Sequence, residues 1–122
     1  MRRLEPTEHQ IQAAFFDIVR RQEGRYPALK LCFACPNGDL RNIVVAKRLK
    51  REGTRPGVPD VLLAVPMGGK SGLAMEFKKK KGMKRTPAQQ AFESYLMMYG
   101  WRCELVYDPE QAWRIVREYL GI

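Results

Sequence analysis

Two short apolar runs joined by a turn constrain the fold of this chain more than any other feature. The runs are DVLLAV (60–65) and GLAMEFK (72–78), and PMGGKS between them has the proline and glycines of a tight turn. Short apolar runs bounded by turn residues predict the two strands of a β-hairpin. Asp60 lies at the mouth of the first run and Glu76 lies inside the second, where a core residue is expected.

Helical patterns flank this hairpin. The first helix is predicted from about Glu8 to Gln22, where Thr7 and Gln10 form a capping box and apolar residues follow at helical spacing. Start and stop residues predict further helices in LRNIVVAKRLKREG (40–53), TPAQQAFESYLMMYG (86–100) and DPEQAWRIVREYL (108–120). The expected buried face of the helix within 86–100 consists of Ala88, Ala91, Phe92, Tyr95, Leu96 and Tyr99.

Two more strands complete the pattern. ALKLCFAC (28–35) alternates and ends at the turn PNGD, and WRCELVY (101–107) lies between two helices. The order is therefore α-β-α-β-β-α-β-α, which predicts an α/β fold with a small mixed sheet flanked by helices on both faces. At 122 residues, the chain is expected to form a single domain, 1–122.

The charge of the chain favours a polyanionic partner. Lys and Arg number 22 against 13 Asp and Glu, a net charge of +9, and nucleic acid is the commonest polyanion that such a field attracts. One basic run begins at the end of the hairpin and a second precedes Asp60. As DNA-binding residues we single out Lys79, Lys80, Lys81, Lys84 and Arg85 in the first run, and Lys47, Arg48, Arg51 and Arg55 in the second. A merely solvated face is the alternative for both runs.

No run of apolar residues is long enough for a membrane span, and MRRLEPTEHQ lacks the apolar core of a secretion signal. We therefore expect a cytosolic protein without membrane contact. The three cysteines argue against a disulfide framework. Cys32 and Cys35 form a C-x-x-C pair that suggests a zinc or thiol protein, but further ligands are distant and the pair lies in a predicted strand, so we favour buried thiols.

The hairpin brings its two acids together. If residues 66–71 form the loop, Asp60 lies opposite Phe77 and diagonal to Glu76, whereas a single bulge places it directly across from Glu76. Two carboxylates this close repel each other unless a cation lies between them. Oxygen ligands favour Mg²⁺ or Mn²⁺, ions that polarise a phosphodiester and activate water. Lys78 points to the same side as Glu76 and suits stabilisation of charge on a phosphate.

Each of these residues also has a structural explanation. Asp60 suits a turn after Pro59, Glu76 suits an ion pair with a lysine, and Lys78 suits a solvated strand end. Together these explanations leave unexplained an acid inside a strand that is apolar on both sides.

The series PD at 59–60, an apolar strand and then EFK at 76–78 resembles the PD-(D/E)xK signature of metal-dependent nucleases. An acid in the opening helix, PNG, the segment REGTRPGVPD and TPAQQ after the hairpin extend the likeness over nearly the whole chain. The whole series is similar to the virus-type replication-repair nuclease (VRR-NUC) domain, whose small stand-alone members are mostly phage-encoded.

This resemblance implies a restriction-endonuclease-like core and cleavage of DNA with Mg²⁺ or Mn²⁺. By the same resemblance Asp60, Glu76 and Glu8 would hold metal, and Lys78 would act in catalysis. Gln89 corresponds to a glutamine at the start of the helix after the hairpin, although capping explains it equally well and Gln90 is a rival. Asn37 suits a turn, and His9 suits either an exposed position or a supporting role beside Glu8.

Stand-alone members of this family resemble Holliday junction resolvases, so the resemblance implies a structure-selective DNA endonuclease that cuts branched DNA. A junction has two symmetry-related cut sites, so a homodimer is expected. Tyr95, Met97, Met98, Tyr99 and Trp113 supply more large apolar side chains than one small core readily hides. The alternatives are a nickase or flap nuclease with the same site, and a catalytically silent module that binds nucleic acid.

Overall fold

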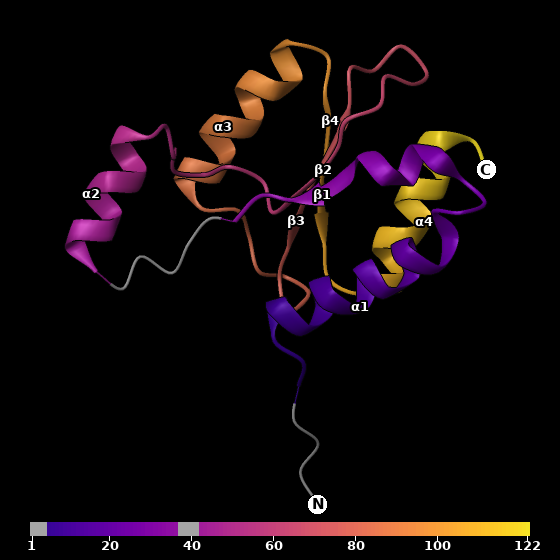
Figure 1. Cartoon of the computed structure of the whole chain (residues 1–122), viewed down its shortest axis with the longest axis horizontal. Helices are drawn as coiled ribbons and strands as arrows, with labels where there is room; N and C mark the ends of the chain where they lie inside the picture. Colours follow the sequence, from indigo (N-terminus) through magenta and orange to yellow (C-terminus); the bar gives the residue numbers. More distant parts are fainter. Residues whose placement is uncertain (1–4, 37–41) are drawn as a thin grey trace, which may run out of the picture.

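The structure, a computed structural model, describes residues 5–36 and 42–122. Its elements follow the predicted α/β order, with one additional 3₁₀ helix (Figure 1). In chain order they are α1 (Glu8–Gln22), η1 (Pro27–Leu31), β1 (Cys32–Ala34), α2 (Ile43–Arg51), β2 (Val61–Leu63), β3 (Leu73–Phe77), α3 (Pro87–Met98), β4 (Arg102–Val106) and α4 (Pro109–Leu120).

The helices begin where their capping residues predict. Thr7 and Thr86 each form a complete capping box, with Gln10 and Gln89 respectively, and Asp108 accepts a hydrogen bond from the backbone N–H of Gln111 at 2.7 Å. Asn42 caps α2, so this helix begins at Ile43, three residues after the predicted Leu40, which lies outside the described residues. Within 5–36 and 42–122, no helix is long and apolar enough to cross a lipid bilayer.

The four strands form one mixed sheet in the order β1-β2-β3-β4. β1 pairs with β2 and β2 with β3 in antiparallel fashion, whereas β3 pairs with β4 in parallel. All five residues of β3 are buried, because it is a central strand with helices over both of its faces. Residues that alternate along β3 therefore lie in two different environments.

The hydrophobic core lies on one face of the sheet, under α1 and α4. Phe15 of α1 packs against Phe77 of β3 with ring centroids 5.8 Å apart, and Val116 of α4 is fully buried in the same cluster. The opposite face carries α3, which lies apart from the α1 and α4 pair in Figure 1. Leu73, Met75 and Phe77 face the core, so Ala74 and Glu76 face the α3 side.

The predicted strand over 28–35 is wrong in its first half. Pro27 to Leu31 form a 3₁₀ helix, and only Cys32 to Ala34 are extended. Pro27 sits at the start of η1 with its φ already suited to a turn. Leu29 of η1 and Cys32 of β1 are buried, while Leu31 and Phe33 are exposed by 51% and 45%.

The predicted buried face of α3 is also wrong. Phe92 and Leu96 are half-buried, but Ala88, Ala91, Tyr95 and Tyr99 are exposed, and the fully buried residue is the acid Glu93. α3 packs mainly on β4 and so covers only part of the sheet. The surplus of apolar side chains at the end of α3 remains in solvent.

Candidate active site

The hairpin contains the bulge that aligns its two acids. At the tip, Met67 and Lys70 exchange backbone hydrogen bonds of 3.0 and 2.9 Å across Gly68 and Gly69, whose φ angles are +56° and +79°. Leu63 pairs with Leu73, and Met67 pairs with Lys70. Three residues separate Leu63 from Met67 on the first strand, but only two separate Lys70 from Leu73 on the second. This extra residue shifts the register of the strands, so that Val61 pairs with Met75 and the next position places Asp60 across from Glu76.

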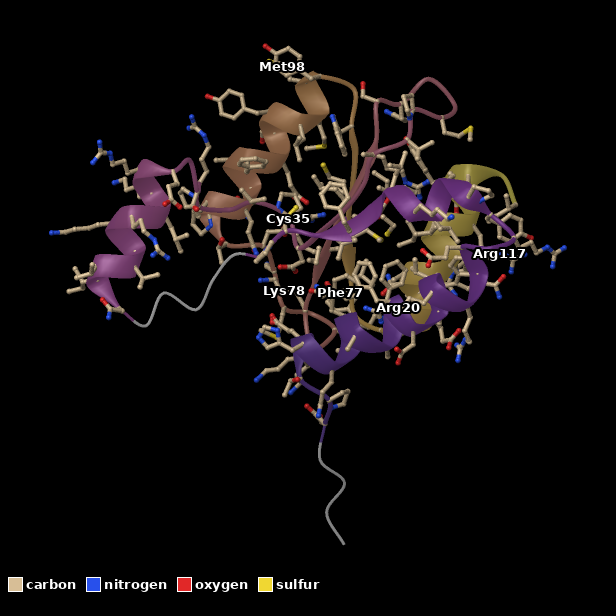
Figure 2. The ribbon with its side chains drawn as sticks, viewed as in Figure 1. Arg20, Cys35, Phe77, Lys78, Met98 and Arg117 are labelled. Atoms are coloured by element: carbon tan, nitrogen blue, oxygen red, sulfur yellow. The ribbon has the colours of Figure 1, made fainter. Side chains whose placement is uncertain are left out.

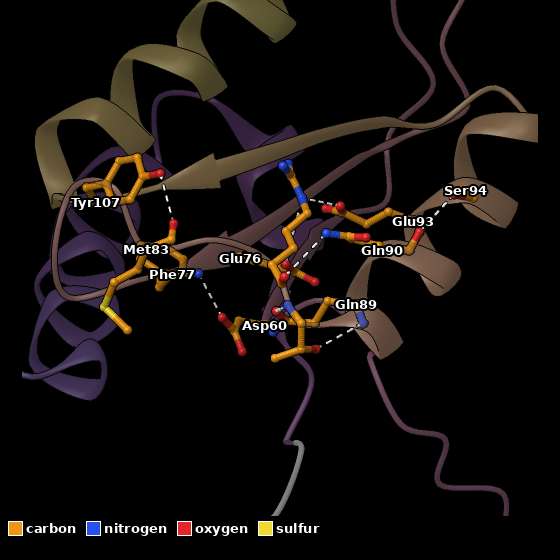
Figure 3. A network of polar contacts seen from close by, with 11 residues as sticks. Asp60, Glu76, Phe77, Met83, Gln89, Gln90, Glu93, Ser94 and Tyr107 are labelled. Atoms are coloured by element: carbon orange, nitrogen blue, oxygen red, sulfur yellow. Dashed lines mark hydrogen bonds and ion pairs between the residues drawn. The ribbon is translucent and has the colours of Figure 1, made fainter.

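The two acids share one face of the sheet, but their side chains have different environments (Figure 3). Asp60 is half-buried, and its Oδ2 accepts a hydrogen bond of 2.7 Å from the backbone N–H of Phe77. Glu76 is 0% exposed, and neither of its carboxylate oxygens has a hydrogen-bond partner among the described residues. A buried carboxylate without a hydrogen-bond donor is costly. The oxygens of Glu76 are therefore suited to bind a cation.

Burial and neighbouring acids raise the proton affinity of both groups. The pKa of Glu76 is raised to about 7, mainly by burial and then by the charges of Glu93 and Asp60, whereas Arg85 and Lys78 oppose the rise. Burial also raises the pKa of Asp60, which Glu8 increases further, while the hydrogen bond from Phe77 and the charge of Lys78 lower it. Such competing acids are typical of sites that hold a cation.

The charges of Lys78 and Glu8 both act on this acid pair: Lys78 on both acids, and Glu8 on Asp60. The backbone N–H of Lys78 donates to Val106 at 2.8 Å, and the residue is only 8% exposed, so its ammonium is held beside the acids rather than in solvent. Glu8 is half-buried in the first turn of α1, where its charge raises the pKa of Asp60. His9 is exposed and lowers the pKa of Asp60. Asn37 lies outside the described residues.

The two glutamines at the start of α3 have different partners. Gln89 forms the capping box: its Oε1 accepts from the backbone N–H of Thr86 at 2.8 Å. The Nε2 of Gln90 instead lies 3.4 Å from the backbone oxygen of Arg85 (Figure 3). Gln89 therefore has the capping role that the sequence suggested.

Sequence reasoning missed Glu93. This residue of α3 is 2% exposed and forms an ion pair with Arg85, whose side chain is 27% exposed. The Nε of Arg85 also lies 4.0 Å from Oε2 of Glu76. The signal was present in the sequence, because Glu93 adjoins Phe92 and lies three residues before Leu96, at the edge of the apolar stripe.

The basic residues flank the acid pair on two sides. Lys79, Lys80, Lys81 and Lys84 are exposed in the loop after β3, and the Oη of Tyr107 donates to the backbone oxygen of Met83 in that loop at 3.2 Å. On the other side, a pocket of about 570 Å³ lies between α2 and the start of α3, and Lys47, Lys50, Arg55, Val58 and Gln89 are among its lining residues. Arg48 and Arg51 are exposed, and Arg48 pairs with Glu52 at 3.8 Å.

The acid pair fits a hard divalent cation. The Glu76 oxygens, which have no hydrogen-bond partner among the described residues, and the carboxylate of Asp60 are the oxygen donors that Mg²⁺ and Mn²⁺ prefer. Among the residues that the structure describes, no three Asp, Glu, His or Cys side chains gather into one metal-holding group. Glu8 therefore does not join Asp60 and Glu76 in such a group in this conformation, and an ion held by the pair would complete its shell with water or phosphate.

The cysteine pair has no comparable features. Cys32, Cys35 and Cys103 are free thiols, and burial raises the pKa of Cys32 to about 12. A thiol with so high a pKa is a poor nucleophile and a poor metal ligand at neutral pH.

An α/β sheet with helices on both faces, whose central hairpin carries an acid pair and a lysine, is the arrangement that the sequence resemblance implies. Among solved structures, one described as a VRR_NUC domain protein matches this chain with a TM-score of 0.80. The match covers 95% of this chain and 89% of that one, at 23% sequence identity. The chain therefore has the fold predicted from its sequence. No protein-family model matches the sequence, and no curated protein does so either.

Proposed function

We propose that this protein is a Mg²⁺- or Mn²⁺-dependent, structure-selective DNA endonuclease that hydrolyses phosphodiester bonds in branched DNA, as Holliday junction resolvases do. The observation that carries the proposal is the Glu76 carboxylate, which is fully buried without a hydrogen-bond partner among the described residues and lies across from Asp60. A divalent cation offsets the repulsion of this pair and accounts for an acid inside the apolar strand.

Asp60 and Glu76 are the proposed metal ligands, with Glu8 as the third carboxylate near them. A divalent ion bound there supplies Lewis acidity toward a phosphate oxygen and acidifies a water molecule. The hydrogen bond from Phe77 fixes the carboxylate plane of Asp60. Lys78, which is only 8% exposed, would supply a positive charge that stabilises negative charge developing on the phosphate. Gln89 caps the start of α3.

The proposed DNA contacts are the exposed lysines after β3, residues 79–81 and 84, together with Lys47, Arg48, Arg51 and Arg55 at α2. Arg85 belongs to the same run, but its partner is Glu93. Contacts of this kind go to phosphates and carry little sequence information, which favours recognition of DNA shape. The protein would act in the cytosol, that of a bacterial host if it is phage-encoded.

A homodimer suits a junction with two symmetry-related cut sites. The exposed apolar side chains at the end of α3, Tyr95, Met97, Met98 and Tyr99, support this assignment (Figure 2). They lie on one helical segment, whereas Trp113 belongs to α4 and packs against the core. We call these four residues the α3 patch.

Labelled four-way junction and linear duplex of the same sequence test the proposal in Mg²⁺, Mn²⁺ and EDTA. We expect symmetric cuts in the junction with either metal, none in EDTA, and slower cleavage of the duplex. Lys78→Ala should lower the cleavage rate by about 100-fold or more and leave junction binding intact, since it removes charge stabilisation from the transition state. Lys84→Ala is the matched control: it should weaken binding, mostly at higher salt, with little effect on the rate at saturation.

Other outcomes assign other functions. Tight junction binding without cuts in either metal would identify a binding module with an inactive site. Cuts confined to one strand, or to flapped ends, would identify the nickase or flap nuclease that uses the same residues.

A further inference from the structure

The Arg85–Glu93 ion pair lies next to the acid pair but outside the residues that the nuclease signature explains. Glu93 reaches it from α3 and Arg85 from the loop after β3. The guanidinium Nε lies 4.0 Å from Oε2 of Glu76, close enough for strong attraction but too far for a hydrogen bond. Arg85 thus stands between two buried carboxylates and is bound to one of them.

Packing does not require this pair. An ion pair withdrawn from water contributes little net stability, and apolar side chains of similar volume often replace one at no cost. The half-buried neighbours on α3, Phe92 and Leu96, show that this face of the helix accommodates apolar residues. The position of the two charges beside Glu76 therefore calls for another explanation.

We propose that Glu93 holds Arg85 away from Glu76 and so keeps both Glu76 oxygens open to a divalent cation. Without Glu93, the guanidinium would move onto Glu76, which has no hydrogen-bond donor among the described residues. It would then compete with the metal for the same oxygens and repel it. Glu93 and Arg85 are positioning residues, since neither touches the reacting atoms. The inference rests on the metal site of the proposed function.

Two other roles make different predictions. If Arg85 contacts DNA phosphate, its loss weakens DNA binding and leaves metal binding unchanged. If Glu93 is itself a metal ligand, its loss weakens metal binding whether or not Arg85 is present. The proposed role requires that the effect of losing Glu93 depends on Arg85, which a double-mutant cycle measures.

The test is Mn²⁺ binding to the full chain at pH 8 without DNA, followed by electron paramagnetic resonance of the free ion. The variants are Glu93→Gln, Arg85→Gln and the double variant, each first shown to be folded by circular dichroism. We expect Glu93→Gln to raise the Mn²⁺ Kd about tenfold in the wild-type background, because Mn²⁺ must then displace Arg85 from its charge-assisted hydrogen bond with Glu76. In the Arg85→Gln background we expect the same change to raise the Kd less than about threefold. Glu118→Gln is the matched control: it removes an acid that pairs with Arg102 at 3.0 Å from α4, and should leave the Kd unchanged.

Should Glu93→Gln alone fail to fold, Arg85→Leu combined with Glu93→Leu removes both charges and keeps the face packed. We expect this variant to bind Mn²⁺ as the wild type does; a tenfold weaker Kd would overturn the proposal. An equal effect of Glu93→Gln in both backgrounds, or no effect in either, would also overturn it and leave the nuclease assignment standing. Absence of Mn²⁺ binding to the wild type would overturn the metal site of the proposed function together with this inference.

Discussion

Glu76 makes the folded protein depend on pH. The folded state holds the proton of this carboxyl up to about pH 7, whereas the unfolded chain releases it near 4.5. Stability should therefore fall as the pH rises from about 4.5 to 7, and stay lower above that range, because folding then buries a charge. The cost of Glu76 in the metal-free protein at pH 8 is on the order of 3 kcal/mol.

Glu76→Gln should remove this cost. We expect the metal-free variant to have a higher Tm than the wild type at pH 8, a similar Tm at pH 4.5, and no nuclease activity. Thermal unfolding in EDTA, followed by circular dichroism at several pH values, measures the difference. The same pH dependence in both proteins would show that Glu76 is not the titrating group.

At the scale of single residues, the sequence predicts some positions and not others. Asp60, Glu76 and Lys78 stood out because charges interrupt apolar strands, and the structure places Asp60 across from Glu76, two residues before Lys78. Glu93 escaped notice because one acid in an amphipathic helix is ordinarily exposed. α3 packs mainly on β4, and in this position Glu93 is buried whereas Tyr95 and Tyr99 are exposed.

Among the elements, the segment before β2 is held by a close backbone approach to α3. A Cβ on Gly57, whose φ is +81°, would lie 2.1 Å from the backbone oxygen of Ala88. Glycine is thus required twice at this position, for its backbone angle and for the contact. The contact links the start of α3, with Gln89, to the segment that leads into Asp60.

Gly57→Ala should therefore destabilise the protein by about 2 kcal/mol or more, since backbone must move as well as adopt a strained angle. Gly53→Ala is the matched control: its φ is +106°, but nothing lies within 4 Å of the added Cβ, so only about 1 kcal/mol is expected. Urea denaturation of both variants gives the comparison. Equal losses would mean that the approach of α3 to Gly57 adds nothing to the strain.

Elements with strong local signals were predictable, and those shaped by tertiary context were not. α1, α3 and α4 begin at capping residues that the sequence shows. The alternation in 28–35 suggested a strand, but Pro27, five residues after the end of α1, favours a further tight turn, and η1 forms instead. The hairpin register depended on a bulge, which the sequence left open and the two-residue turn at Gly68 and Gly69 resolves.

For the whole molecule, the α3 patch makes oligomeric state the property to measure. Met98 is 71% exposed and Tyr99 73% exposed, so neither contributes to the core of one chain. We expect a wild-type mass of about twice 14.1 kDa in sedimentation equilibrium. Tyr95→Glu combined with Met98→Glu should give the monomer mass, because a charge buried at an interface without a partner is costly.

Ile43→Glu is the control for this change. Ile43 is 74% exposed on α2 and does not belong to the α3 patch, so its replacement should leave the mass unchanged. A monomeric wild type at concentrations that saturate the junction would contradict the proposed homodimer.

The packing of α1 against α4 has a consequence for synthesis. Phe15 and Val19, near the beginning of the sequence, share one core cluster with Val116 and Leu120, near its end. A growing polypeptide on the ribosome cannot close this core until α4 has emerged, because the missing helix leaves β3 uncovered on that side. The hairpin acids, which we propose to bind a divalent cation, therefore take up their final positions only after the last helix has docked.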